Sequence, residues 1–169
     1  MQFKGQSLDE AVADYHRRAE GQASIDYAFH LIISDASPAV VKEQLPRMVE
    51  AGYTSFKIYM TYESLKLSDR EILDVLDAAR TLGALSMIHA ENDDCIAWLT
   101  ERLLAQGKTA PRYHALAHSA IGEREATHRA ISLSELVDVP ILLVHVSSRA
   151  AVEQIHWARG QGFNIFSET

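Results

Sequence analysis

The stretch SFKIYMTY, Ser55 to Tyr62, has the pattern of a β-strand with a lysine in its middle. Phe56, Ile58 and Met60 alternate with more polar residues, and a period of two is typical of a strand. Lysine is almost never fully buried unless it is paired. The pattern therefore leaves two interpretations of Lys57 open: either the strand lies at the edge of a sheet, or the amine has a chemical role.

The segments on either side alternate between strand and helical patterns. Apolar runs typical of strands occur at 25–34, 84–90, 140–148 and 163–168. We expect helices at 7–21, 37–52, 68–83, 92–107 and 147–162, and further helix at 111–138 with breaks at Pro111 and Gly122. Strands that alternate with helices predict right-handed crossovers and a parallel sheet, and buried parallel strands are almost continuously apolar. The predicted fold class is therefore α/β.

Length and composition limit the function classes. The chain has 169 residues, 47% of them hydrophobic and 23% charged, which is typical of one globular domain. A net charge of −7 argues against nucleic acid or an anionic membrane as the main partner. No apolar run approaches the ~20 residues of a membrane span, and residues 1–20 lack an apolar signal core. The lone Cys95 excludes an internal disulfide. We expect a cytoplasmic protein.

Three of the strand patterns carry a polar residue near their carboxyl end: Lys57, His89 in SMIHAEN and His145 in LLVHVSS. Active sites of parallel α/β folds collect at the carboxyl ends of the strands. Two imidazoles and an amine are therefore expected to converge at one end of the sheet. For each residue a structural interpretation stays open, since a strand histidine is often a core residue and a strand lysine often lies at an edge.

The other candidate side chains give weaker signals. We interpret three histidines in polar helical contexts as surface residues: His16, His128 and His156. His114 and His118 lie one helical turn apart and could hold a metal, but a solvated helix face is the preferred interpretation. The role of His30 stays open. Asp93 and Asp94 begin a helix, where carboxylates interact favourably with the helix dipole.

Several segments together resemble one branch of a known family. The motifs SFKIYMTY, HAEN and LLVHVSS, supported by GQSLDEAVADYH, IDYAFHLII, LDAARTLGAL and GFNIFSET, resemble the dihydropyrimidinases and hydantoinases of the cyclic-amidohydrolase family. The resemblance covers essentially the whole chain. It implies part of a TIM-type (β/α)8 barrel, about strands three to seven, with residues 1–169 as a single partial barrel domain. The rest of the barrel and an outer β-sandwich would lie outside these residues.

The resemblance also implies a chemistry. In this family a strand lysine, matched by Lys57, forms a carbamate that bridges two zinc ions, and His89 and His145 match two histidines that hold the second metal. Tyr62 matches the tyrosine that hydrogen-bonds the substrate carbonyl and stabilises the developing oxyanion. The implied activity is that of a metal-dependent hydrolase that opens dihydropyrimidine or hydantoin rings to N-carbamoyl amino acids. The implied partner is a small cyclic amide, and we expect a homo-oligomer.

The chain also departs from the family's pattern. Its His-x-His pair, which holds the first metal, has no match among the eight histidines, and its proton-transferring aspartate would follow Thr169. We therefore expect the isolated chain to be inactive or nearly so. Alternative hypotheses are a non-catalytic relative that serves as an assembly or binding protein, and an allantoinase- or dihydroorotase-type hydrolase. A self-contained flavodoxin-like domain is a further alternative, although no glycine-rich phosphate loop is present.

Overall fold

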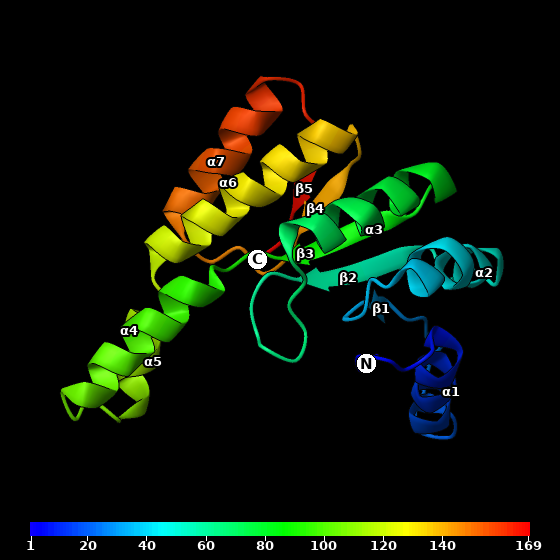
Figure 1. The fold of residues 1–169 in the computed structure, drawn as a ribbon, viewed down its shortest axis with the longest axis horizontal. Helices are drawn as coiled ribbons and strands as arrows, with labels where there is room; N and C mark the ends of the chain where they lie inside the picture. Colours follow the sequence, from blue (N-terminus) through cyan, green and yellow to red (C-terminus); the bar gives the residue numbers. More distant parts are fainter.

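Five parallel strands form one sheet in the computed structural model, which describes residues 1–169 (Figure 1). The strands are β1 (Leu31–Ile32), β2 (Ser55–Tyr59), β3 (Leu85–His89), β4 (Ile141–Leu143) and β5 (Ile165–Ser167). Their order in the sheet follows their order in the chain. A doubly wound sheet of the flavodoxin type reverses its strand order at a switch point, whereas a β/α barrel does not. The topology therefore supports the barrel prediction and contradicts the flavodoxin alternative.

Helices connect the strands, as the alternating pattern predicted. They are α1 (Leu8–Ala19), α2 (Leu45–Glu50), α3 (Asp69–Leu82), α4 (Asp93–Ala105), α5 (His114–Ala117), α6 (Ala120–Val137) and α7 (Arg149–Gly160), with a π-helical turn at Val40–Gln44 and a 3-10 turn at Pro111–Tyr113. Capping boxes open α1 at Ser7 and α3 at Ser68. Gly83 ends α3 with φ of 68°, a left-handed conformation that glycine adopts without steric cost. Local capping signals therefore set these helix boundaries.

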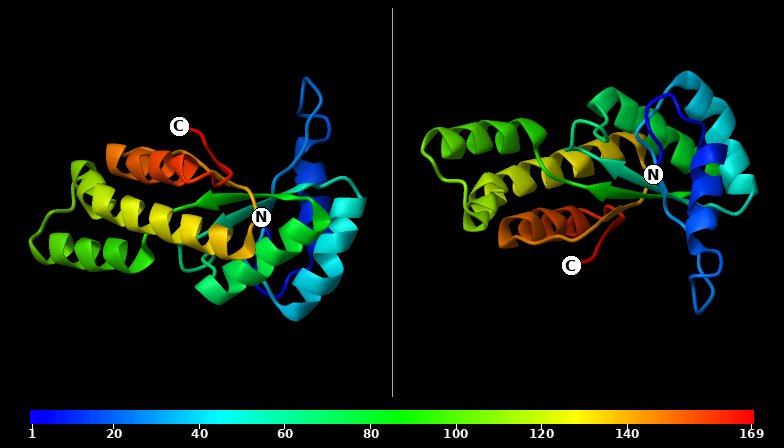
Figure 2. Two further views of the ribbon diagram at one scale, coloured as in Figure 1. Left: turned by 90° about the horizontal axis from the view of Figure 1, so that it is seen from above. Right: turned by 90° about the horizontal axis from the view of Figure 1, so that it is seen from below.

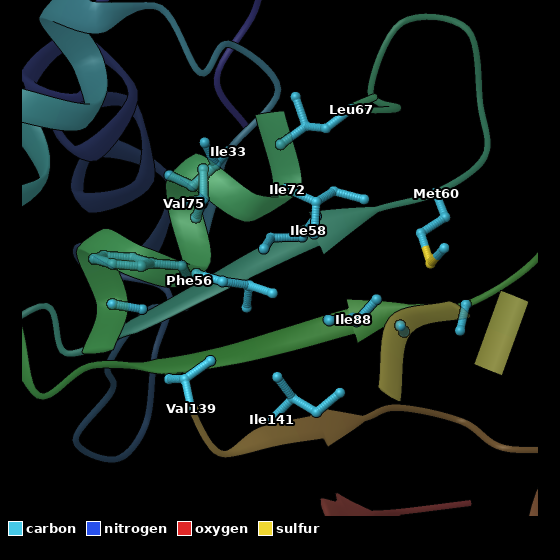
Figure 3. Packing of buried hydrophobic residues seen from close by; sticks show 14 of the residues in the cluster. Ile33, Phe56, Ile58, Met60, Leu67, Ile72, Val75, Ile88, Val139 and Ile141 are labelled. Atoms are coloured by element: carbon cyan, nitrogen blue, oxygen red, sulfur yellow. The ribbon is translucent and has the colours of Figure 1, made fainter. Parts of the chain in front are cut away.

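The outward face of the sheet packs against the helices to form the hydrophobic core. Phe56 and Ile58 of β2 are fully buried, and so are Ile88 of β3 and Ile72 and Val75 of α3 (Figure 3). The intervening residues of β2, among them Lys57, are only half-buried and lie on the opposite face. That second face is therefore the one available for chemistry.

One helical unit lies apart from this core. Helix α4 has no buried residue, and α4 and α5 project together away from the sheet (Figures 1 and 2). None of the helices combines the length and the apolar character that a membrane span requires.

Two local predictions are wrong in detail. The expected strand at 25–34 is reduced to Leu31–Ile32, since Tyr27 and Phe29 pack against each other and against His16 of α1. The expected helix break at Gly122 is also wrong, because Ser119 caps the helix three residues earlier and Gly122 lies within α6. A β-carbon at Gly122 would make only ordinary contacts, 3.4 Å from Ser119 Oγ and 3.6 Å from the β-carbon of Cys95, so the helix passes through this position without strain.

Removing core volume behind β2 is expected to destabilise the chain. Ile58 is fully buried, and an isoleucine-to-alanine change in a core costs about 2–5 kcal/mol. Ile58→Ala should lower the free energy of unfolding by that amount in urea denaturation. The matched control is Ile25→Ala, because Ile25 is 84% exposed and its loss should change the free energy of unfolding by less than about 0.5 kcal/mol. Equal effects of the two changes would contradict the assigned core.

Candidate metal centre

His89, His145 and Tyr62 lie at the carboxyl end of the sheet, and Lys57 lies in the middle of β2, two residues before its end. His89 is the last residue of β3, His145 follows β4 by two residues, and Tyr62 follows β2 by three. The imidazole rings of His89 and His145 are 4.4 Å apart between centroids and meet edge to face. The ring of Tyr62 lies 5.1 Å from that of His89. The predicted convergence of polar strand ends is therefore present.

Lys57 has an amine that is buried without a hydrogen-bond partner. Strand β2 pairs with β1 on one side and with β3 on the other, so Lys57 is not on an edge strand. Its Nζ makes no hydrogen bond and lies 4.9 Å from the centroid of the Tyr59 ring. Burial lowers the pKa of Lys57 to about 8, although the charge of Glu168 acts in the opposite direction. A buried amine without a partner is energetically costly, and its presence at this end of the sheet points to a ligand.

His89 is held by a carboxylate two residues further along the chain. Its Nε2 lies 2.8 Å from Glu91 Oε2, and the other oxygen of Glu91 lies 2.7 Å from Nδ1 of His118. The hydrogen bond from His89, with a second one from His118, lowers the pKa of Glu91 to about 2 against the effect of burial. An ionised carboxylate only accepts, so Nε2 of His89 carries the proton. In the neutral imidazole Nδ1 then keeps its lone pair for a metal.

His145 is exposed at the mouth of the site and has an unusual backbone conformation. Its φ is 40°, in the left-handed region that few residues other than glycine adopt. The next turn is tied to α6, since the backbone N–H and the hydroxyl of Ser147 both donate to Glu123, at 2.7 and 3.1 Å. Although the residue is exposed overall, partial burial of the imidazole, together with the neighbouring charge of His89, lowers the pKa of His145. The neutral imidazole, which is the form that binds metals, is therefore favoured.

Tyr62 lies at the rim of the same site. The residue is 44% exposed and its φ is 72°. Burial of the phenol, with the nearby negative charge of Glu91, raises the pKa of Tyr62. The hydroxyl therefore stays protonated at neutral pH and can donate a hydrogen bond.

Tyr62, His89 and His145 border an open cleft of about 300 Å³, whose lining does not include Lys57. Its lining includes Tyr62, His89, Glu91, His118 and Glu123. The interpretation of His118 as part of a solvated helix face is wrong, because its side chain is only 19% exposed and pairs with Glu91. The roles of Glu91 and Glu123 are not predicted by the sequence pattern, and only Glu91, in the motif HAEN, lies close to a candidate residue in the chain. His16, His128 and His156 are exposed, as predicted.

The donor set limits how a metal could bind. No group of three or more His, Cys, Asp or Glu side chains is arranged to hold a metal ion. Lys57, His89 and His145 supply two imidazoles and an amine that has no partner. A protonated amine has no lone pair, whereas a carbamate on the same nitrogen would add an anionic oxygen ligand. The residues therefore fit a divalent metal provided that Lys57 is carboxylated.

The sequential parallel sheet and the polar strand ends define the class of protein as a segment of a (β/α) barrel with its site at the carboxyl ends of the strands. No family model matches the chain. It is 45% identical to the D-hydantoinase of Geobacillus stearothermophilus over 168 residues, 98% of this chain and 36% of that protein. A solved D-hydantoinase structure superposes with a TM-score of 0.96 at 41% identity, over 99% of this chain and 37% of the other.

A second solved structure, the dihydropyrimidinase of Brevibacillus agri NCHU1002, superposes with a TM-score of 0.95 at 44% identity over 98% of this chain and 36% of that one. The chain is thus a homologue of the D-hydantoinases and dihydropyrimidinases, which are cyclic amidohydrolases, and it spans little more than a third of their length. The predicted partial barrel is confirmed.

The Glu91 hydrogen bonds predict a pH-dependent contribution to stability. The folded pKa of about 2 lies below the ordinary value of 4.5, so this contribution is present above pH 4.5 and is lost as the pH falls toward 2. The difference in free energy of unfolding between the wild type and Glu91→Gln should therefore shrink between about pH 5 and about pH 3. Glu101→Gln, at an exposed site on α4, is the control and should show no such trend. A constant difference for Glu91→Gln would contradict the hydrogen-bonded arrangement.

Proposed function

We propose that this chain supplies part of the active site of a metal-dependent cyclic amidase that opens dihydropyrimidine or hydantoin rings to N-carbamoyl amino acids. The observation that carries the proposal is the buried, unpartnered Nζ of Lys57, on the same face of the sheet as His89, whose ring lies 4.4 Å from that of His145 between centroids. The names of the relatives, D-hydantoinase and dihydropyrimidinase, support the substrate class.

Lys57 is suited to react with carbon dioxide. Its pKa of about 8 leaves a substantial fraction of the amine neutral and nucleophilic near neutral pH. The nitrogen lone pair forms a bond to the carbon of CO₂ and a proton leaves the nitrogen, so the product is an anionic carbamate. His89, His145 and this carbamate would hold a divalent metal such as zinc. When bound, such a metal acts as a Lewis acid toward the amide carbonyl and lowers the pKa of water.

The other side chains of the site would polarise the substrate carbonyl and orient a metal ligand. Tyr62 would donate a hydrogen bond from its phenolic O–H to the carbonyl oxygen of the scissile amide, where negative charge develops in the transition state. Glu91 keeps the proton of His89 on Nε2 and so directs Nδ1 toward the metal. Burial keeps Tyr62 protonated at the pH at which Lys57 begins to lose its proton. The two groups can therefore act together near neutral pH.

The remaining expectations about the whole protein are also proposals. Residues 1–169 would form a single partial barrel domain, and by themselves would show little or no hydrolysis because only three metal ligands are among them. A homo-oligomer in the cytoplasm is the arrangement that we propose.

Zinc content measures the proposed ligand set directly. The chain purified with zinc and bicarbonate should hold close to one zinc ion, by elemental mass spectrometry, and ¹³C-bicarbonate should give a carbamate NMR signal. Lys57→Ala should abolish both, since it removes the nitrogen that carries the carbamate. Lys42→Ala, at an exposed lysine, is the matched control and should leave both unchanged. Zinc retained at the wild-type level in Lys57→Ala would contradict the proposed ligand.

Hydrolysis can be tested in a chimera in which residues 1–169 replace the matching segment of the Geobacillus stearothermophilus D-hydantoinase. Tyr62→Phe should lower kcat for hydantoin by about 10²–10³, the usual cost of losing an oxyanion donor. Tyr27→Phe, at another exposed tyrosine, should leave kcat unchanged. An active chimera whose kcat is insensitive to Tyr62→Phe would contradict the role of the phenol.

A further inference from the structure

Asp93, the first residue of α4, binds the loop that follows β2. Its Oδ1 accepts hydrogen bonds from the hydroxyl of Thr61 at 2.8 Å and from the backbone N–H of Tyr62 at 3.1 Å. Its Oδ2 accepts a hydrogen bond from Nζ of Lys66 at 2.6 Å. One carboxylate thus contacts three residues of a loop that lies about thirty positions earlier in the chain, a role beyond the helix-dipole effect that its position predicted.

The loop needs such a restraint at Tyr62. A φ of 72° places this residue in the left-handed region, which costs a residue with a β-carbon roughly 1 kcal/mol or more. On its carbonyl side the conformation is fixed by a turn, since the N–H groups of Leu65 and Lys66 both donate to Tyr62 O at 2.8 Å. On its N–H side the only partner is Asp93. The carboxylate therefore completes the hydrogen bonding that holds this backbone conformation.

The backbone conformation at Tyr62 decides where the phenol points. In the observed conformation the ring lies against Tyr59 and His89, at centroid distances of 6.0 and 5.1 Å, over the mouth of the cleft. Rotation of φ into the ordinary negative region would redirect the Cα–Cβ bond and carry the ring away from His89. The position of the phenol relative to the site thus depends on contacts made by the main chain.

We propose that Asp93 is a positioning residue that holds Tyr62 over the candidate metal centre through Thr61, the Tyr62 amide and Lys66. The inference rests on the proposed function for the importance of the phenol, but the restraint itself is a property of this chain. The hydrogen bond and charge of Lys66 lower the pKa of Asp93, so the carboxylate is ionised and accepts all three bonds at neutral pH.

Two measurements on the 169-residue chain test the restraint. Asp93→Ala should speed amide hydrogen exchange at Tyr62 about tenfold, with faster exchange at Leu65 and Lys66, since the loop loses its hydrogen bonds to α4. A 3-fluorotyrosine placed at position 62 should give a ¹⁹F resonance that shifts in this variant, because the ring leaves His89. Asp93→Asn keeps an oxygen that can accept from Thr61 and Tyr62 and should restore most of the exchange protection.

Asp94→Ala is the matched control, since Asp94 lies in the same first turn of α4 but is exposed and makes no hydrogen bond to the loop. Its exchange and ¹⁹F spectrum should match the wild type. Unchanged exchange in Asp93→Ala, or an equal change in both alanine variants, would overturn the proposal. Neither readout depends on metal or turnover. A failed restraint is therefore distinguishable from a failed function, which the kcat of Tyr62→Phe in the chimera reports.

Discussion

Parallel pairing of β2 with β3 is the constraint on which the site depends. The register places Tyr59 beside His89 and Lys57 beside Met87, so the amine and the imidazole rise from neighbouring strands on the same face. β4 continues the pairing and brings His145 to within 4.4 Å of His89 between ring centroids. A shift of one residue in either register would turn these side chains toward the helices and put core residues in their place.

Three carboxylates hold the residues that this register brings together. Glu91 binds the ring of His89, Glu123 binds the turn that follows His145, and Asp93 binds the loop that contains Tyr62. Tyr62 and His145 both have positive φ values, and non-glycine residues keep such conformations only where the surroundings restrain them. The negative charge around the cleft thus stabilises geometry, and Lys57 is the one site residue that has no such partner.

The strand-and-helix alternation could be predicted because its signals are local. Apolar periodicity and serine caps act within a few residues, so α1 and α3 begin directly after Ser7 and Ser68, where helices were predicted to start. The strand predicted at 25–34 is shorter than expected because an aromatic side chain of this segment packs against His16 of α1. A local sequence pattern does not show such a contact between distant residues. The helix break predicted at Gly122 is wrong because the cap is Ser119, so that Gly122 lies inside the first turn of α6.

The sequence by itself determined that this is a parallel α/β protein with Lys57, His89 and His145 at strand ends, because period and strand position are properties of neighbouring residues. Its motifs also indicated Tyr62 by resemblance to the cyclic amidohydrolases. Only the tertiary structure decided that the amine of Lys57 is buried without a partner and that His118 joins Glu91 and His89. Desolvation and hydrogen bonding between distant segments depend on how the elements pack, and the chain order of the residues does not encode that packing locally.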